Sequence, residues 1–127
     1  MNPAAEGTVY PDVPFPIDAA RVAAFRRVFG VTEGVPPTFV TAAEFTVFPH
    51  VIGDPNLALD FTRVLHGSQE YDYQRPLREG ETLSVRARIE SIRQKGETGF
   101  LTVVMELRDD EGQLVCTARS QMVERAS

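Results

Sequence analysis

Few side chains in this sequence could perform acid–base chemistry. They are its two histidines, His50 and His66, and two carboxylates beside apolar segments, Glu44 and Asp60. Glu44 stands inside a long apolar segment, where a buried carboxylate with a raised pKa would be a plausible general base. The pattern favours a simpler interpretation, in which Thr41 and Glu44 mark the one wet or interface-facing side of that segment.

The histidines have structural explanations as well. His50 follows Pro49 at the end of an expected helix, where the helix dipole mildly favours its positive form, so a structural or solvated role is the favoured interpretation. His66 precedes Gly67 in an expected strand and could touch a ligand, but a hydrogen-bonded strand histidine is the favoured alternative. Asp60 is the residue to consider with His66 if the chain is active by itself.

Composition bounds the domain organisation and the kinds of partner. With 127 residues, the chain can close one core, and we expect a single domain over 1–127 with frayed ends at 1–8 and 125–127. The formal net charge is −5 and Lys95 is the one lysine, so nucleic acid is not an expected partner. No apolar run is long enough to span a bilayer, and residues 1–6 lack the regions of a secretion signal, so we expect a cytoplasmic protein without membrane contact.

The single cysteine, Cys116, lies among apolar residues of an expected strand. Neither a disulfide nor a cysteine-ligated metal site is therefore available within one chain. We expect Cys116 to pack in the core, and the sequence indicates neither a metal nor a redox cofactor.

The segment 35–48 is apolar on almost every side and predicts a buried helix. Pro36 and Pro37 suit its first turn, which does not use the amide hydrogens that proline lacks. Pro49 and the turn at 53–55 are expected to end it. A helix of this kind must be enclosed by other elements.

Alternating polar and apolar residues after residue 60 predict those elements as strands. The expected strands cover 62–73, 82–94, about 101–107 and 114–123. Gly67 inside the first of them indicates a bulge or a close approach by another group. An extended edge segment at 9–16 and a helix between Asp18 and Gly30 come earlier in the chain. We expect the four strands to form a meander around the central helix, an α+β arrangement called the hotdog fold; an ordinary core helix in another α+β domain is the alternative.

A longer sequence pattern carries a family resemblance. It consists of residues 64–83, VLHGSQEYDYQRPLREGETL, preceded by PPTF at 36–39 and followed by the hairpin DEGQLV at 110–115. Over roughly residues 9 to 125, this combination resembles the N-terminal-type domain of MaoC-like dehydratases. It is similar to the non-catalytic half of double-hotdog (R)-specific enoyl-thioester hydratases and of (3R)-hydroxyacyl-ACP dehydratase heterodimers.

The resemblance implies a chemistry that this chain carries only in part. The family adds water across an α,β-unsaturated thioester with an aspartate and a histidine placed between the first and the central helix. Residues 30–35 occupy that place here and include neither. The resemblance therefore implies the half of a hydratase that shapes the acyl tunnel, while a partner hotdog supplies the catalytic pair. The substrate would be an acyl thioester carried on coenzyme A or acyl carrier protein.

The resemblance also implies which side chains border the tunnel. They are Phe39, Phe45, Phe48, His66, Gly67, Gln69, Tyr71 and Arg75. The aromatic residues have plain core packing as their alternative. Arg75, with Arg78, Arg86 and Arg88, could meet the phosphates of the carrier, or it could fix the turn at Pro76.

Two other functions stay open. Hotdog thioesterases place a catalytic carboxylate on the central helix, so Glu44 or His66 could serve a homodimeric acyl-CoA thioesterase. The chain could also bind acyl thioesters without turning them over. For each of these three functions we expect a homodimer or a heterodimer, because a lone sheet leaves an edge strand and an apolar face to cover.

Overall fold

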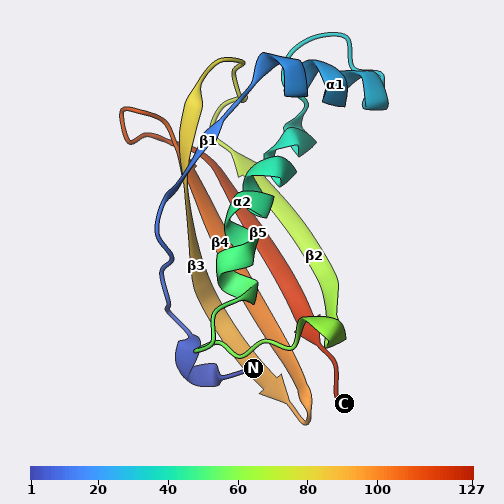
Figure 1. Cartoon of the computed structure of the whole chain (residues 1–127), viewed down its shortest axis with the longest axis vertical. Helices are drawn as coiled ribbons and strands as arrows, with labels where there is room; N and C mark the ends of the chain where they lie inside the picture. Colours follow the sequence, from blue (N-terminus) through green and yellow to red (C-terminus); the bar gives the residue numbers. More distant parts are fainter.

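One antiparallel sheet and two α-helices make up the fold in the computed structural model, which describes residues 1–127. The sheet order is β1-β3-β4-β5-β2. The strands are β1 (Val13–Pro16), β2 (Val64–Tyr73), β3 (Thr82–Lys95), β4 (Thr98–Arg108) and β5 (Leu114–Glu124), and the helices are α1 (Ala19–Phe29) and α2 (Thr41–Ile52). In Figure 1, α2 runs along the sheet, α1 lies at one end of the molecule and both termini lie at the other. The expected α+β hotdog fold is confirmed.

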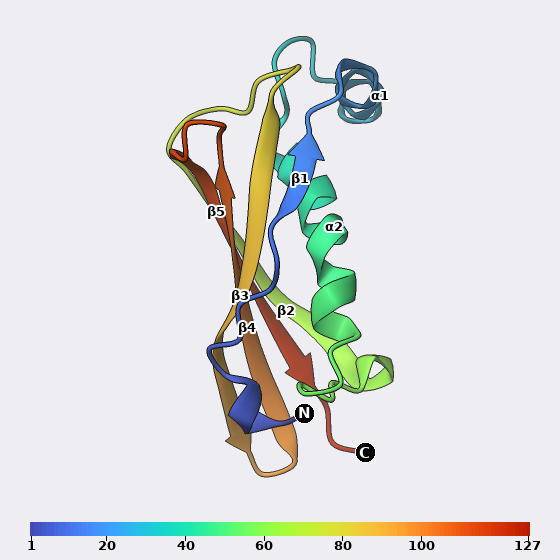
Figure 2. The same ribbon diagram turned by 60° about the vertical axis from the view of Figure 1, so that its left-hand side comes forward.

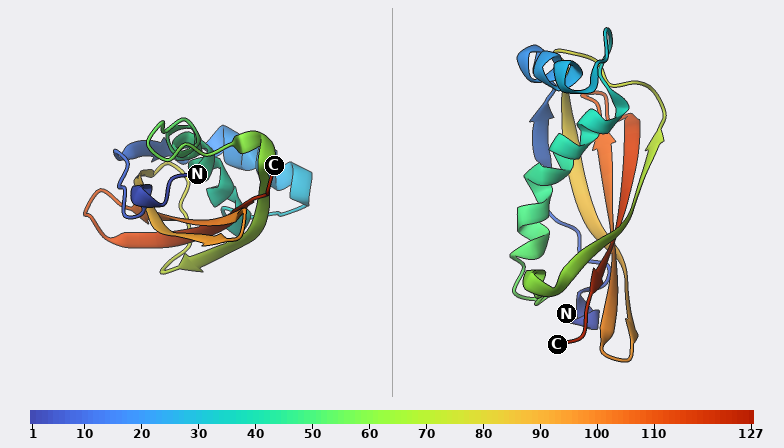
Figure 3. Two further views of the ribbon diagram at one scale, coloured as in Figure 1. Left: turned by 90° about the horizontal axis from the view of Figure 1, so that it is seen from below. Right: turned by 90° about the vertical axis from the view of Figure 1, so that its right-hand side faces the viewer.

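The central helix α2 covers one face of the sheet, and Figures 2 and 3 show both α-helices on this same side. Ala43, Val47 and Val51 recur at a spacing of four residues, so they share one helix face, and all three are fully buried. Phe45 on the other side of the helix is 69% exposed. The helix is apolar all round, as predicted, but one chain encloses only part of it.

A short 3-10 turn, Pro37–Val40, leads into α2. Pro49 lies inside α2, which continues to Ile52. The expectation that Pro49 ends the helix is therefore wrong. Proline costs the helix one hydrogen bond, to the carbonyl of Phe45 four residues earlier, but packing of the buried face holds the last turn. Gly53 ends the helix by donating its N–H to the Pro49 carbonyl at 3.0 Å.

The strands β3, β4 and β5 form a meander, but β2 does not pair with β3. It pairs with β5 instead, with Tyr71 opposite Ala118, so the predicted four-strand meander is wrong. β3 is free to pair with β1 on the far side. The register of β2 shifts between His66 and Ser68, which confirms the predicted bulge at Gly67.

Several local predictions for the first quarter of the chain hold, and one fails. The Asp18 side chain caps α1 by accepting from the N–H of Arg21 at 3.0 Å, and Gly30 ends α1 with φ of 67°. Residues 1–8 are not frayed. Asn2 N–H donates to the Leu57 carbonyl at 2.7 Å, and Gly7 N–H donates to the Ile89 carbonyl at 3.0 Å, so this segment is tied to the loop after α2 and to β3.

The core lies between α2 and the concave face of the sheet. Phe39, only 2% exposed, packs against Phe15 and Phe25 at ring-centroid distances of 5.9 and 5.5 Å. Cys116 is free and buried, as expected, and burial raises the pKa of its thiol to about 12. None of the helices is both long and apolar enough to cross a membrane.

Candidate functional site

A cavity of about 630 Å³ lies beside α2, bordered by β2 and the short 3-10 turn Phe61–Arg63. This volume is in the range of small-molecule binding sites. The lining consists of Thr38, Thr41, Glu44, Phe45, Phe48, Pro49, Ile52, Phe61, Val64, His66, Gln69, Tyr71 and Met122. Most of these side chains are apolar or aromatic, and the polar ones gather where α2 faces the middle of β2.

Glu44 is the centre of that polar wall and is only 2% exposed. The Tyr71 hydroxyl donates to Glu44 Oε1. Since this uses the only proton of the phenol, Thr41 Oγ1, at 2.9 Å from the Tyr71 oxygen, is the donor to Tyr71. Ser120 Oγ lies 3.1 Å from Glu44 Oε2. The carboxyl group therefore has a partner on β2 and another on β5.

The environment of Glu44 favours its neutral form. Burial raises the pKa of the carboxyl, and the hydrogen bonds of Tyr71, Ser120 and Gln69 and the nearby His66 offset only part of that rise. Burial also raises the pKa of Tyr71 to about 12, assisted by its hydrogen bond to Glu44. Burial thus disfavours the charged form of both groups.

The hydroxyl of Ser120 connects Glu44 to Gln69. Ser120 Oγ lies within hydrogen-bond distance of both Glu44 Oε2 and Gln69 Oε1, and a hydroxyl has one proton to donate. The polar wall is therefore one continuous network that runs from Thr41 through Tyr71, Glu44 and Ser120 to Gln69. Gln69 also interacts with Glu44 directly and lowers the pKa of its carboxyl.

The apolar wall of the cavity is partly open. Phe45 and Phe48 on α2 stack edge to face, with ring centroids 6.4 Å apart. Phe61, 58% exposed, also lines the cavity. β2 is an edge strand that pairs only with β5, so the cavity opens beside a row of unpaired backbone groups.

Five of the residues expected to border an acyl tunnel line this cavity: Phe45, Phe48, His66, Gln69 and Tyr71. Phe39 does not line it. Its side chain points to the other side of the 3-10 turn before α2, into the aromatic cluster of the core. Glu44 is not on a wet side of the helix, because its side chain is only 2% exposed in this chain.

Gly67 and Asp60 lie outside the cavity lining. A Cβ atom at position 67 would come within 3.3 Å of the Gln121 carbonyl, so the glycine allows β5 to approach the bulge. Asp60 caps the 3-10 turn through the Thr62 N–H and pairs with Arg63 at 2.9 Å. Both residues have structural roles in this geometry.

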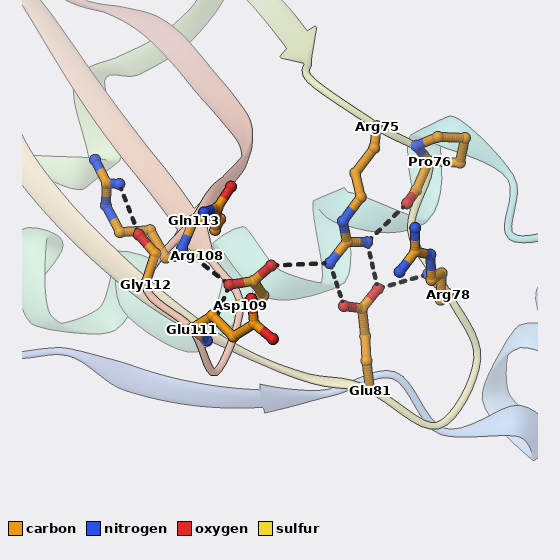
Figure 4. A network of polar contacts seen from close by, with 9 residues as sticks. All are labelled: Arg75, Pro76, Arg78, Glu81, Arg108, Asp109, Glu111, Gly112 and Gln113. Carbon is orange, nitrogen blue, oxygen red and sulfur yellow. Dashed lines mark hydrogen bonds and ion pairs between the residues drawn. The ribbon is translucent and has the colours of Figure 1, made fainter.

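Arg75 also lies away from the cavity, in the network that Figure 4 shows. Its guanidinium donates to both carboxylate oxygens of Glu81, at 3.0 and 2.7 Å, and lies 3.6 Å from Asp109. The turn between β2 and β3 is thereby joined to the hairpin between β4 and β5. Since two carboxylates already neutralise the charge, the arrangement supports the alternative that Arg75 fixes the turn rather than binds phosphate.

Comparison with known proteins agrees with this fold. The family model described as "FAS1-like, dehydratase domain region" matches residues 8–118. The chain belongs to this family. A UPF0336 protein of Streptomyces coelicolor is 41% identical over 92 residues, which are 72% of this chain and 61% of that protein. The chain thus matches about three fifths of the length of this curated relative.

Solved structures similar to this FAS1-like dehydratase-region protein share its fold. One is the HadBC (3R-hydroxyacyl-ACP dehydratase) complex of Mycobacterium tuberculosis, with a TM-score of 0.80, 17% identity and coverage of 94% of this chain and 96% of that one. Another is a MaoC-like dehydratase, with a TM-score of 0.79, 18% identity and coverage of 98% of this chain and 43% of that one. The expected resemblance to MaoC-like dehydratases is confirmed.

The sequence analysis did not identify several residues of the candidate site, and Ser120 is the most important of them. β5 alternates, with Ala118, Ser120 and Met122 buried and Arg119 and Gln121 exposed. A serine at an inward position of an otherwise apolar face needs a buried partner, and this signal was available. Phe61 and Ile52 gave no comparable signal, because their contribution depends on the path of the loop after α2.

Proposed function

We propose that this chain is the tunnel-forming, non-catalytic half of an (R)-specific enoyl-thioester hydratase, or 3-hydroxyacyl-thioester dehydratase. One observation carries the proposal: an acyl-sized, mostly apolar cavity opens beside the free edge of the sheet, and its lining contains no aspartate to pair with His66. Hydration needs a positioned base and a positioned acid. The missing groups would come from a partner hotdog that adjoins β2.

The open wall of the cavity supports a partner at this place. Phe45 and Phe61 are among the most exposed large apolar side chains of the chain, and both border the cavity. Exposed apolar surface beside an unpaired strand is typical of an interface. The similar HadBC protein was solved as a complex, which supports a heterodimer, although a homodimer would cover the same surface.

Hydration of a trans-2-enoyl-CoA, followed as loss of the enoyl absorbance, tests the proposal. The full chain is assayed alone and after co-expression with a hotdog protein encoded beside it that carries the aspartate and histidine. We expect turnover only in the mixture. Turnover by the chain alone would refute the half-site proposal, and silence of the mixture would leave acyl-thioester binding without catalysis as the better description.

A thioesterase is the second candidate, favoured by the position of Glu44 on the central helix at the cavity wall. Both oxygens of the Glu44 carboxyl are already hydrogen-bonded, to Tyr71 and to Ser120, so neither is free to accept a proton from water without rearrangement, which is why we rank this activity second. Release of free thiol from a panel of acyl-CoA substrates, lost in Glu44→Gln, would establish it. The absence of thiol release from every substrate would exclude it.

A further inference from the structure

A second cavity, of about 380 Å³, lies at the end of β2 that leads into the turn towards β3. Residues 73–77, with Val35 and Pro37 of the segment before α2, line it, and its surface is mostly apolar. The one charged lining residue, Arg75, is already paired with Glu81. Since an apolar cavity of about 150 Å³ accommodates a benzene ring, this one is large enough for an aromatic side chain.

An exposed aromatic side chain stands at the opposite end of β2. Phe61 belongs to the 3-10 turn that directly precedes the strand, at the lower end of β2 in Figure 1, and it is 58% exposed. β2 pairs only with β5, so the backbone groups along its other edge are free. One free strand edge thus has a projecting ring before it and an apolar hollow after it.

Two copies of this chain bring ring and hollow together when their β2 strands pair antiparallel. A two-fold axis perpendicular to the sheet produces this pairing and keeps both α2 helices on the same side. With the ten residues of β2 fully overlapped, Val64 lies opposite Tyr73 and His66 opposite Tyr71, so side chains that face the two cavities meet on one face of the sheet. The turn before β2 in one copy then lies beside residues 74–77 of the other.

We propose that two copies of this chain pair in this register and that Phe61 of each copy inserts into the second cavity of the other. A two-fold interface must be complementary to itself, and the edge of β2 meets this condition. The register also places no like charges opposite each other, because Asp72 faces Leu65 and Glu70 faces Gly67. The inference does not depend on the proposed function, in which a catalytic hotdog takes the place of the second copy at the same edge.

Light scattering and sedimentation of the full chain over a range of concentrations test the pairing. We expect a dimer whose dissociation constant rises about tenfold or more in Phe61→Glu, which corresponds to about 1.4 kcal/mol or more, because a charge replaces a ring inside an apolar cavity. Val9→Glu is the matched control. Val9 is 56% exposed and lies beside β3, away from β2, so this variant should dimerise like the wild type. Both variants replace exposed side chains and should fold normally in a thermal unfolding experiment.

Cross-linking tests the register. The double variant Phe61→Cys with Pro76→Cys should form a disulfide-linked dimer under mild oxidation. Within one chain the length of β2 separates the two positions by about 30 Å, whereas a disulfide needs Cα atoms within about 7 Å, so the bond must join two chains. Each single variant should stay unlinked, since the two-fold axis keeps identical positions apart. Cys116 does not interfere, because it is buried and the pKa of its thiol is raised to about 12.

A monomer at every concentration would overturn the inference, as would a dimer that Phe61→Glu leaves intact. A dimer without the cross-link between positions 61 and 76 would have another register, which would overturn the insertion of Phe61. Association with a different hotdog protein alone would overturn the pairing of two copies. The hydration assay with a catalytic partner is read out separately, so failure of this inference and failure of the proposed function are distinguishable.

Discussion

Ser120 Oγ lies 3.1 Å from Glu44 Oε2, and this contact joins residues 76 positions apart in the sequence. It connects β5 to α2 inside the domain, beside the polar wall of the cavity. The contact explains how a carboxyl group is tolerated on the covered face of the central helix. It also makes the protonation state of Glu44 a property that can be measured.

Glu44→Gln should stabilise the protein increasingly as the pH rises. The pKa of Glu44 is raised in the folded state from its ordinary 4.5, so the wild type has its full stability below pH 4.5 and loses part of it as the pH rises through the folded-state pKa. Glutamine has no charge to bury. The difference in free energy of unfolding should grow to about 1–3 kcal/mol by pH 9, as measured by urea unfolding at several pH values. Parallel curves for the two proteins would show that Glu44 ionises freely.

The tyrosines should resist ionisation in the folded protein. The chain has three; burial raises the pKa of Tyr10 and Tyr73 above the ordinary 10.0 and that of Tyr71 to about 12. Their neutral forms stabilise the fold below pH 10, and this contribution is lost above it. Tyrosinate absorbance should therefore have a midpoint near pH 10 in urea and appear in the native protein only with alkaline unfolding. A native phase near pH 10 would mean that one of the phenols is exposed.

Phe39 and Phe45 should respond in opposite ways to truncation. Phe39→Ala removes a fully packed core ring and should cost about 3–5 kcal/mol of stability. Phe45→Ala removes an exposed ring, so its effect on stability should stay within about 0.5 kcal/mol, while acyl-thioester affinity falls. Thermal unfolding and calorimetric titration separate the two. Similar losses of stability in both variants would contradict the placement of Phe45.

Arg75→Met should destabilise the protein without changing acyl-thioester affinity. Arg75 lowers the pKa of Glu81 below its ordinary 4.5. The pKa of Asp109 is lowered first by the Gln113 N–H and more weakly by Arg75. The pairing therefore stabilises the protein above pH 4.5 and is lost as the pH falls through the lowered values. We expect a loss of about 1–3 kcal/mol at pH 7 that shrinks towards pH 3. Weaker binding of coenzyme A thioesters with unchanged stability would instead favour a role in phosphate binding.

The sequence was sufficient to predict the helices and strands, but not to predict every pairing between strands. Alternation located β3 and β5, because each has one wet and one buried face. The pairing of β2 with β5 was missed, since a long turn leaves both edges of the growing sheet accessible and alternation does not choose between them. Pro49 misled the prediction of the end of α2, because tertiary packing outweighed the loss of one helical hydrogen bond.

The candidate site was predictable where family resemblance and inward-facing positions agreed, as at Tyr71 and Gln69. Glu44 was misjudged because a carboxylate on an apolar helix is usually the wet side, and its partner Ser120 lies on a strand far away in the sequence. Phe39 was misplaced because a 3-10 turn precedes α2, and it changes the direction in which residues before Thr41 point.

The two edges of the sheet differ in one further way. β1 contains Pro14 and Pro16, which have no N–H to donate to another strand, whereas β2 contains no proline along Val64–Tyr73. At the β1 end of the sheet, these prolines stand opposite Ser84 and Thr82 of β3. A further strand would therefore find fewer backbone donors at β1 than at β2. If two such sheets join through their β2 edges, the proline residues that shape β1 also make the outer edge of the pair a poor template for adding more strands.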